Sequence, residues 1–152
     1  MSDFDFRSEI SSEYIDDLRS LLFFNAEQQK VADGIVASIE KYGLPKIDDD
    51  GTKLKVSVEK VPEIQAIYAY RKYENIDELV GVMLFFRESV DCISLVHIAV
   101  KENYSISSSK GESMLTLEML YRLKDIARHL KKVEYLSIYY QRYVAKRIII
   151  NK

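Results

Sequence analysis

The stretch that decides the fold runs from Ile93 to Tyr139 and reads ISLVHIAVKENY (93–104), SISSSKGES (105–113), MLTLEMLYRLKDIARHL (114–130) and KKVEYLSIY (131–139). An apolar strand is followed by a Ser/Gly-rich turn, an amphipathic helix and a second apolar strand. This order predicts a βαβ crossover. The turn then lies at the start of a helix, which is a natural binding place for an anion or a phosphate.

Two helices are expected before this stretch. Phe4 and Phe6 alternate with aspartates, which indicates a short edge strand. The first helix begins at Ser11 or Ser12 and carries one apolar stripe. The second begins near Asn25 and ends at Gly43 and Pro45, in the usual order for a helix end.

Strands dominate the middle of the chain. A turn is expected at Asp48-Asp49-Asp50-Gly51, where adjacent carboxylates are too close in sequence to converge on a metal ion. Four strand patterns follow, at 54–58, 64–70, 79–86 and 93–100. The connections between the last three are short enough for an antiparallel meander. We therefore expect one α+β domain over residues 1–152, with a mostly antiparallel mixed sheet flanked by helices in the order (β)ααββββαβ.

Composition narrows the class of protein. The chain has 152 residues, 47% of them hydrophobic and 30% charged, as in ordinary globular proteins. No apolar run approaches the roughly 20 residues of a membrane span, and the first residues do not resemble a secretion signal. The single cysteine, Cys92, supports neither an internal disulfide nor a metal cluster. These features predict a cytoplasmic protein that has no metal site and does not enter a membrane.

Charge is distributed unevenly along the chain. Residues 1–50 hold twelve acidic and five basic side chains, whereas residues 120–152 hold two acidic and nine basic ones. Such a dipole steers anionic ligands toward the basic half. Packing of the acidic helices near the basic end explains the same pattern, so both interpretations stay open.

The Ser/Gly turn also has two interpretations. Unpaired backbone N–H groups at the helix start, Gly111 and the hydroxyls of Ser107, Ser108 and Ser109 suit a phosphate, and Lys110 adds a positive charge. Glu112 opposes a phosphate but stabilises a helix start. The sequence of the turn is therefore as consistent with a helix N-cap as with a phosphate site.

The element order and this turn resemble the GNAT acetyltransferase superfamily, in a divergent form with a short C-terminal region. In the family pattern a Val and an aromatic precede Arg or Gln, two residues, Gly, one residue, and Gly or Ala. Val100, Tyr104 and Gly111 fit this pattern, and Ser113 stands at the last small position. Ser108 replaces the Arg or Gln, and residues 105–107 look like an insertion.

The resemblance implies that acetyl-CoA is the cofactor. The cofactor-binding residues that it implies are Val100, Ser108, Ser109, Lys110, Gly111 and Ser113. It also implies that a backbone N–H near Ala99 to Lys101 polarises the thioester carbonyl. A tyrosine beyond the next strand, Tyr140 or Tyr143, would then protonate the leaving thiolate.

His97 is the candidate base, because its ordinary pKa lies near 6.5. Alternation places it on one strand face with Ile93, Leu95 and Ala99, where a hydrogen-bonded core histidine is the competing interpretation.

Three functions remain from the sequence. The first is an acetyl-CoA-dependent N-acyltransferase whose amine acceptor is unknown. The second is an inactive GNAT-like module that dimerises or engages a partner through an exposed sheet edge or through Ile148-Ile149-Ile150. The third, nucleic-acid binding by the basic tail, is disfavoured by the acidic overall charge.

Overall fold

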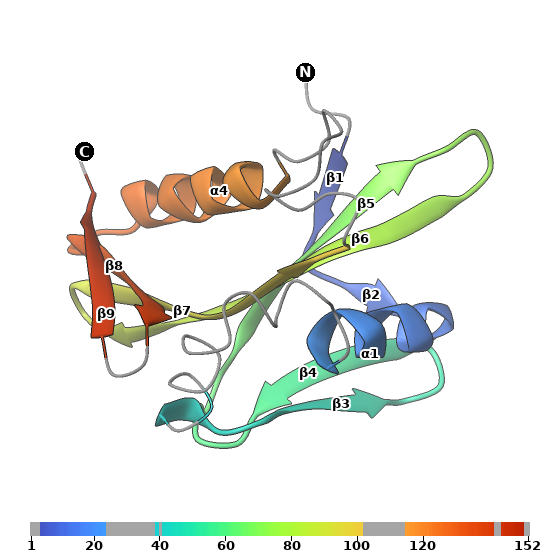
Figure 1. Cartoon of the computed structure of the whole chain (residues 1–152), viewed down its shortest axis with the longest axis horizontal. Coiled ribbons are helices and arrows are strands. Elements are labelled where there is room, and N and C mark those ends of the chain that lie inside the picture. The colour runs from blue at the N-terminus through green and yellow to red at the C-terminus, as the bar shows by residue number, and fades with distance from the viewer. Residues whose placement is uncertain (1–3, 24–38, 40, 102–114, 142–143, 151–152) are drawn as a thin grey trace.

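The computed structural model describes residues 4–23, 39, 41–101, 115–141 and 144–150. These residues form an α+β fold with two sheets, two α-helices and a short 3-10 helix (Figure 1). None of the helices in these ranges is long and apolar enough to cross a membrane.

The larger sheet has six strands. In spatial order they are β1 (Phe4–Arg7), β5 (Gln65–Lys72), β6 (Asp77–Ser89), β7 (Cys92–Val100), β8 (Tyr135–Gln141) and β9 (Val144–Ile149). All neighbouring strands are antiparallel except β7 and β8, which are parallel. The helix α4 (Leu115–His129) lies between β7 and β8 in the chain. The predicted meander and βαβ crossover are therefore confirmed.

The smaller sheet has three strands and was not predicted as a separate unit. It pairs β2 (Ile10–Ser11) and β3 (Pro45–Asp49) with the two edges of β4 (Lys53–Val58). The 3-10 helix Ser12–Tyr14 leads into α1 (Ile15–Phe23), which confirms the first predicted helix.

The six-stranded sheet separates two hydrophobic cores. Figure 1 shows α4 on one face of the sheet, with α1 and the three-stranded sheet on the other. On the α4 side, Leu115, Met119 and Leu123 are fully buried against strand residues such as Phe85 and Leu95. The second core joins α1 and β4 to the opposite sheet face, and its members include Leu18, Leu21, Val56, Tyr70, Val82 and Leu84. Both faces of β6 are thus covered, as its nearly continuous apolar sequence predicts.

The end of the chain differs from its expected form. The segment from Gln141 onward, expected to be a short tail, contributes β9 along the edge of the sheet. Val144 and Ala145 both belong to this strand. Pairing with β8 supplies the hydrogen bonds that a local pattern cannot reveal.

The aspartate turn acts through hydrogen bonds. The Asp49 side chain accepts from the Gly51 N–H at 2.8 Å, and Asp50 accepts from the N–H groups of Thr52 and Lys53. These bonds hold the pKa of both carboxyls below the ordinary value, with the Ser12 hydroxyl making the largest contribution at Asp49. The turn is shorter than predicted, because Asp48 and Asp49 end the strand β3 and only residues 50–52 connect it to β4.

Most of the second predicted helix lies outside the described residues, but its end is visible. Ile39, Lys41 and Tyr42 are helical, and the Gly43 N–H donates to the Ile39 carbonyl at 2.8 Å. Gly43 has a φ of 90°, a conformation that favours glycine. The predicted helix end at Gly43 is confirmed.

Candidate functional site

The candidate site lies where β7 and β8 part. Their parallel ladder begins at Cys92 and Tyr135 and ends at Leu95 and Ile138. Beyond that pair, β7 continues to Val100 and β8 to Gln141 without pairing to each other. Ligands in sheets with parallel strands often bind beyond the carboxyl ends of such strands, where neighbouring elements diverge. The geometry therefore directs attention to the second half of β7.

A β-bulge marks the same point in β7. Phe85 pairs with Leu95, whereas Leu84 pairs with His97, so Val96 is an extra residue on β7. Because one extra residue exchanges the two faces of a strand, His97 points to the same side as Leu84, toward the α1 core.

The predicted common face for Ile93, Leu95, His97 and Ala99 is therefore wrong. Ile93 and Leu95 belong to the α4 core, while Ala99 belongs to the α1 core and His97 shares its side. The bulge at Val96 is the physical reason, because it breaks strict alternation.

His97 is partly buried at this bulge. Burial lowers the pKa of His97 from about 6.5 to about 4, since a charged imidazole loses hydration there. The ring is consequently uncharged at neutral pH.

The free energy of unfolding should fall by about 1–2 kcal/mol between pH 6.5 and pH 5 through His97 alone. Between pH 6.5 and pH 4 the unfolded chain binds a proton at His97 and the folded chain does not. The contribution of His97 to the free energy of unfolding is therefore fully present above pH 6.5 and is lost as the pH falls toward 4. Urea denaturation of the natural chain and of His97→Gln at several pH values measures this slope. The slope should weaken in His97→Gln and persist in His129→Gln, which changes an exposed histidine. Equal slopes in all three proteins would contradict the assignment.

Val100 and its neighbours have defined roles in packing. The Val100 side chain is buried in the α4 core, so only its backbone can face a ligand. The Lys101 N–H donates to the Val80 carbonyl at 2.8 Å. Of the predicted carbonyl-polarising groups around Ala99 to Lys101, the Lys101 N–H is thus already used within the sheet.

The remaining predicted site residues fall largely outside the described ranges. They are Ser108, Ser109, Lys110, Gly111, Ser113 and Tyr143. Tyr140 belongs to β8, at a second irregularity where the pairing with β9 shifts between Tyr139 and Gln141. Among the predicted residues, the described structure therefore brings His97 and Val100 together on β7 and places Tyr140 on the strand that parts from it.

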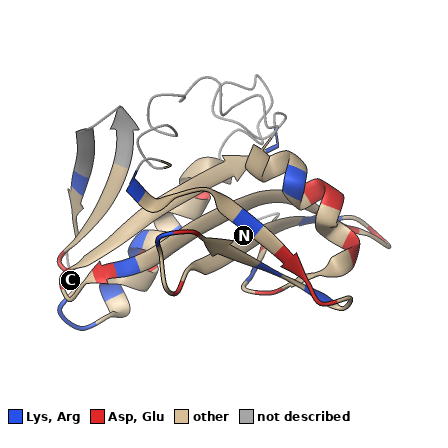
Figure 2. Cartoon of the chain, turned by 90° about the horizontal axis from the view of Figure 1, so that it is seen from below, with Lys and Arg blue, Asp and Glu red and all other residues tan. Residues whose placement is uncertain are grey.

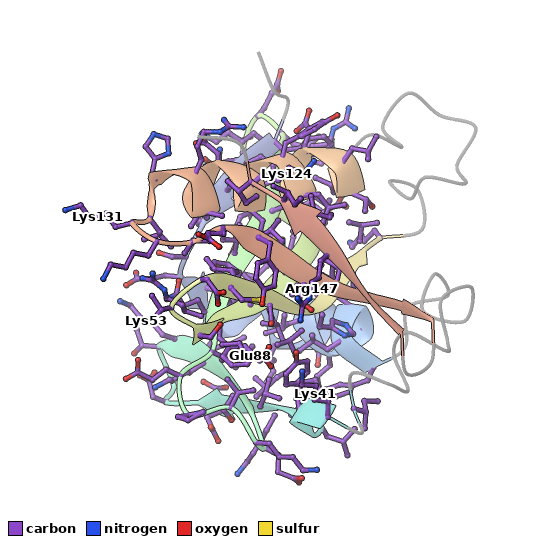
Figure 3. All side chains as sticks on the ribbon, turned by 90° about the vertical axis from the view of Figure 1, so that its left-hand side faces the viewer. Lys41, Lys53, Glu88, Lys124, Lys131 and Arg147 are labelled. Atoms are coloured by element: carbon purple, nitrogen blue, oxygen red, sulfur yellow. The ribbon has the colours of Figure 1, made fainter. Side chains whose placement is uncertain are left out.

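A polar cluster that the sequence did not predict lies beside the paired end of β7. The Glu88 carboxylate accepts hydrogen bonds from the Ser94 hydroxyl at 3.0 Å and the Tyr42 hydroxyl at 3.3 Å. Lys41 Nζ lies 3.1 Å from Glu88 Oε1 (Figure 3). Burial raises the pKa of Glu88, but the bonds from Lys41, Ser94 and Tyr42 outweigh burial and leave that pKa below its ordinary value.

This cluster joins the helix that ends at Tyr42 to β6 and β7. Ser94 is fully buried and pairs with Ser137 of β8, one residue before the ladder ends. Tyr42 lies 46 positions before Glu88 in the chain, and Lys41 lies 53 positions before Ser94, so no local spacing could reveal the cluster. The cluster stabilises the end of β7 that pairs with β8. Its hydrogen bond to β7 is made at Ser94, before the point where the two strands no longer pair.

Cys92 lies in the same region and is buried. Burial raises the pKa of its thiol, which keeps it protonated and unreactive. Among the residues that the structure describes, no group of three or more His, Cys, Asp or Glu side chains is placed to hold a metal ion.

Comparisons with known proteins found no matching family model, no matching curated protein and no matching solved structure.

Proposed function

We propose that the chain is an acyl-CoA-dependent N-acyltransferase of the GNAT type. The proposal rests on the ending of the parallel β7–β8 ladder at Leu95 and Ile138, next to the bulge at Val96. The pantetheine arm of coenzyme A is an extended chain with two amide groups. Such a chain can bind along a strand where a neighbouring strand has left, in the manner of a peptide added to a sheet edge.

The crossover connection supports the same proposal. The chain passes from β7 to α4 through the Ser/Gly segment that resembles the family's pyrophosphate loop. A diphosphate bound at the start of this helix would align the pantetheine arm with β7. Besides the helical residues Ile39, Lys41 and Tyr42, the described residues contain the helices α1 and α4, and the resemblance rests on the sheet, the crossover and the turn.

The chemistry assigns a role to each group. In such a transfer the amine nitrogen would attack the thioester carbon, a β7 backbone N–H would polarise the carbonyl oxygen, and the C–S bond would break. Tyr140 or Tyr143 then donates a proton to the departing thiolate. His97, with a pKa of about 4, accepts a hydrogen bond from the amine and orients it, while the amine proton passes to water.

Acetyl-CoA at millimolar concentration should raise the melting temperature. A ligand at about one hundred times its dissociation constant adds about 2.7 kcal/mol, which corresponds to about 5–10 °C for a chain of this size. The shift should disappear in Gly111→Asp and persist in Thr52→Asp, which adds the same charge to an exposed turn of the smaller sheet. Circular dichroism confirms that each variant is folded. Absence of a shift in the folded natural chain would reject the proposal.

A second candidate function is an inactive module that assembles through β9. This strand forms an edge of the six-stranded sheet, and Ile149 is 77% exposed. Analytical sedimentation at increasing protein concentration distinguishes this candidate from the enzyme. An inactive module of this kind should self-associate and should not respond to acetyl-CoA.

A further inference from the structure

A groove of about 730 Å³ opens away from the Glu88 cluster, at the other end of the molecule. It is bounded by the start of α1, by the turn between β5 and β6, and by Lys101 after β7. Figure 1 shows the β5–β6 hairpin and α1 extending toward the same end. The volume lies within the range of about 300–1,000 Å³ found for small-molecule sites.

Apolar groups line the groove and remain in water. The Tyr73 side chain is 52% exposed and Ile76 is 70% exposed, both in the turn between β5 and β6. Arg71 lies 5.7 Å from the Tyr73 ring, which therefore already interacts with a cation at one side. Exposed aromatic and aliphatic groups that line a groove are typical of ligand sites. The exposed apolar side chains therefore indicate a ligand site without reference to the charged side chains of the groove.

The charges determine the sign of the ligand. Among the residues that the structure describes, four acidic side chains line the groove: Asp17, Glu74, Asp77 and Glu78. Arg7 binds Asp77 at 2.8 Å, and Lys101 Nζ lies 3.6 Å from Glu78. Asp17 and Glu74 form no ion pair with another described residue. Asp16 and Asp17 of α1 are exposed, and the ribbon in Figure 2 marks acidic positions on this helix.

The wall near α1 is held in place by several contacts. The Tyr14 hydroxyl donates to the Asp77 carbonyl at 2.8 Å, and its ring packs edge-on against Tyr70 at 5.3 Å. Arg7 stacks over the Tyr70 ring at 4.4 Å while binding Asp77. Burial raises the pKa of Tyr14, and the charges of Glu13, Asp77 and Asp17 raise it further. These contacts hold this wall in place, and among its described lining residues the groove has four acidic side chains and one basic side chain, Lys101.

We propose that this groove binds an aliphatic diammonium ion, with one ammonium group at Asp17, the other at Glu74, and the hydrocarbon chain against Tyr73 and Ile76. Carboxylates bind ammonium groups through charge-assisted hydrogen bonds, and tyrosine faces attract cations. A phosphate ligand is excluded by the same carboxylates. Diamine binding in this groove does not require acyl transfer and goes beyond the proposed function.

Isothermal titration with 1,4-diaminobutane at pH 7.5 and low salt tests the site in the full chain, without acyl-CoA. We expect saturable binding of the diamine and none of 1,4-butanediol, which has the same length without charge. The double variant Asp17→Asn/Glu74→Gln should weaken binding by about a hundredfold or more, since two charge-assisted hydrogen bonds are lost.

The matched control is Asp16→Asn/Glu63→Gln. It removes the same two charges, one of them from the same helix turn, at exposed positions outside the groove. This control should bind diaminobutane as the natural chain does. Equal weakening in both double variants, equal binding of butanediol, or no binding by the natural chain would overturn the proposal. Because no acyl-CoA is present, each outcome is separate from the acetyl-CoA experiment.

Discussion

Leu123→Ala should reduce the free energy of unfolding by about 2–5 kcal/mol, a large part of the roughly 5–15 kcal/mol available to a typical domain. Leu123 lies in the middle of α4 and is fully buried, with Met119 and Ala127 one turn away on either side. The substitution removes apolar contact with the sheet and leaves a cavity that the packed strands cannot fill. Denaturation by urea, followed by circular dichroism, measures the loss.

Tyr121→Ala is the matched control on the same helix. Tyr121 is 62% exposed, and Lys124 Nζ lies 5.6 Å from the centre of its ring. Truncation there should change stability by no more than about 0.5 kcal/mol. Similar losses for the two variants would mean that α4 does not pack on the sheet through Leu123.

Gly43→Ala should also destabilise the chain strongly, by about 2–5 kcal/mol. Gly43 has a φ of 90°, which costs an L-residue about 1–2 kcal/mol. An added Cβ would also lie 2.5 Å from the Cβ of Glu59, an atom fixed to the backbone of the next segment. Relief of that overlap requires a backbone shift, for which overpacking costs of about 1–3 kcal/mol are typical.

Gly51→Ala separates these two contributions. Gly51 has a similar φ of 93°, but no atom lies within 4 Å of the position of an added Cβ. Its loss of stability therefore measures the backbone cost alone, and the difference between the two variants measures the overlap with Glu59. Chemical denaturation of both variants provides the comparison. Equal losses would show that the segments at Gly43 and Glu59 separate easily.

The crossover was predictable because its signals are local and strong. Leu115, Met119 and Leu123 recur at helical spacing, and the flanking strands are continuous apolar runs. Each of these patterns depends only on which face of one element is buried. The α+β class and the antiparallel meander followed from the same kind of signal.

The missed elements depend on partners far away in the chain. β3 begins at Pro45 and continues into aspartates, a composition that indicates a turn, and it forms a strand because β4 pairs with it. β9 contains the adjacent cations Lys146 and Arg147, which obscure alternation in an edge strand. Neither strand was predicted, because pairing rather than composition stabilises both.

The candidate site was only partly accessible to sequence reasoning. His97 was recognised from its chemistry, but its face was wrong because no local signal marks Val96 as a bulge. The parting of β7 and β8 depends on where two distant strands stop pairing. Charge counts located an acidic segment at residues 1–50, but only the fold brings Asp17 next to the turn that holds Glu74.

The six-stranded sheet contributes side chains to both hydrophobic cores, and this arrangement affects how the protein unfolds. Along β5, Ile67 and Ala69 belong to the α4 core, while Tyr68 and Tyr70 belong to the α1 core. Loss of either layer would expose one side of the same strands and weaken the backbone pairing that supports the other. The two layers are therefore energetically coupled, and we expect them to melt in one cooperative transition.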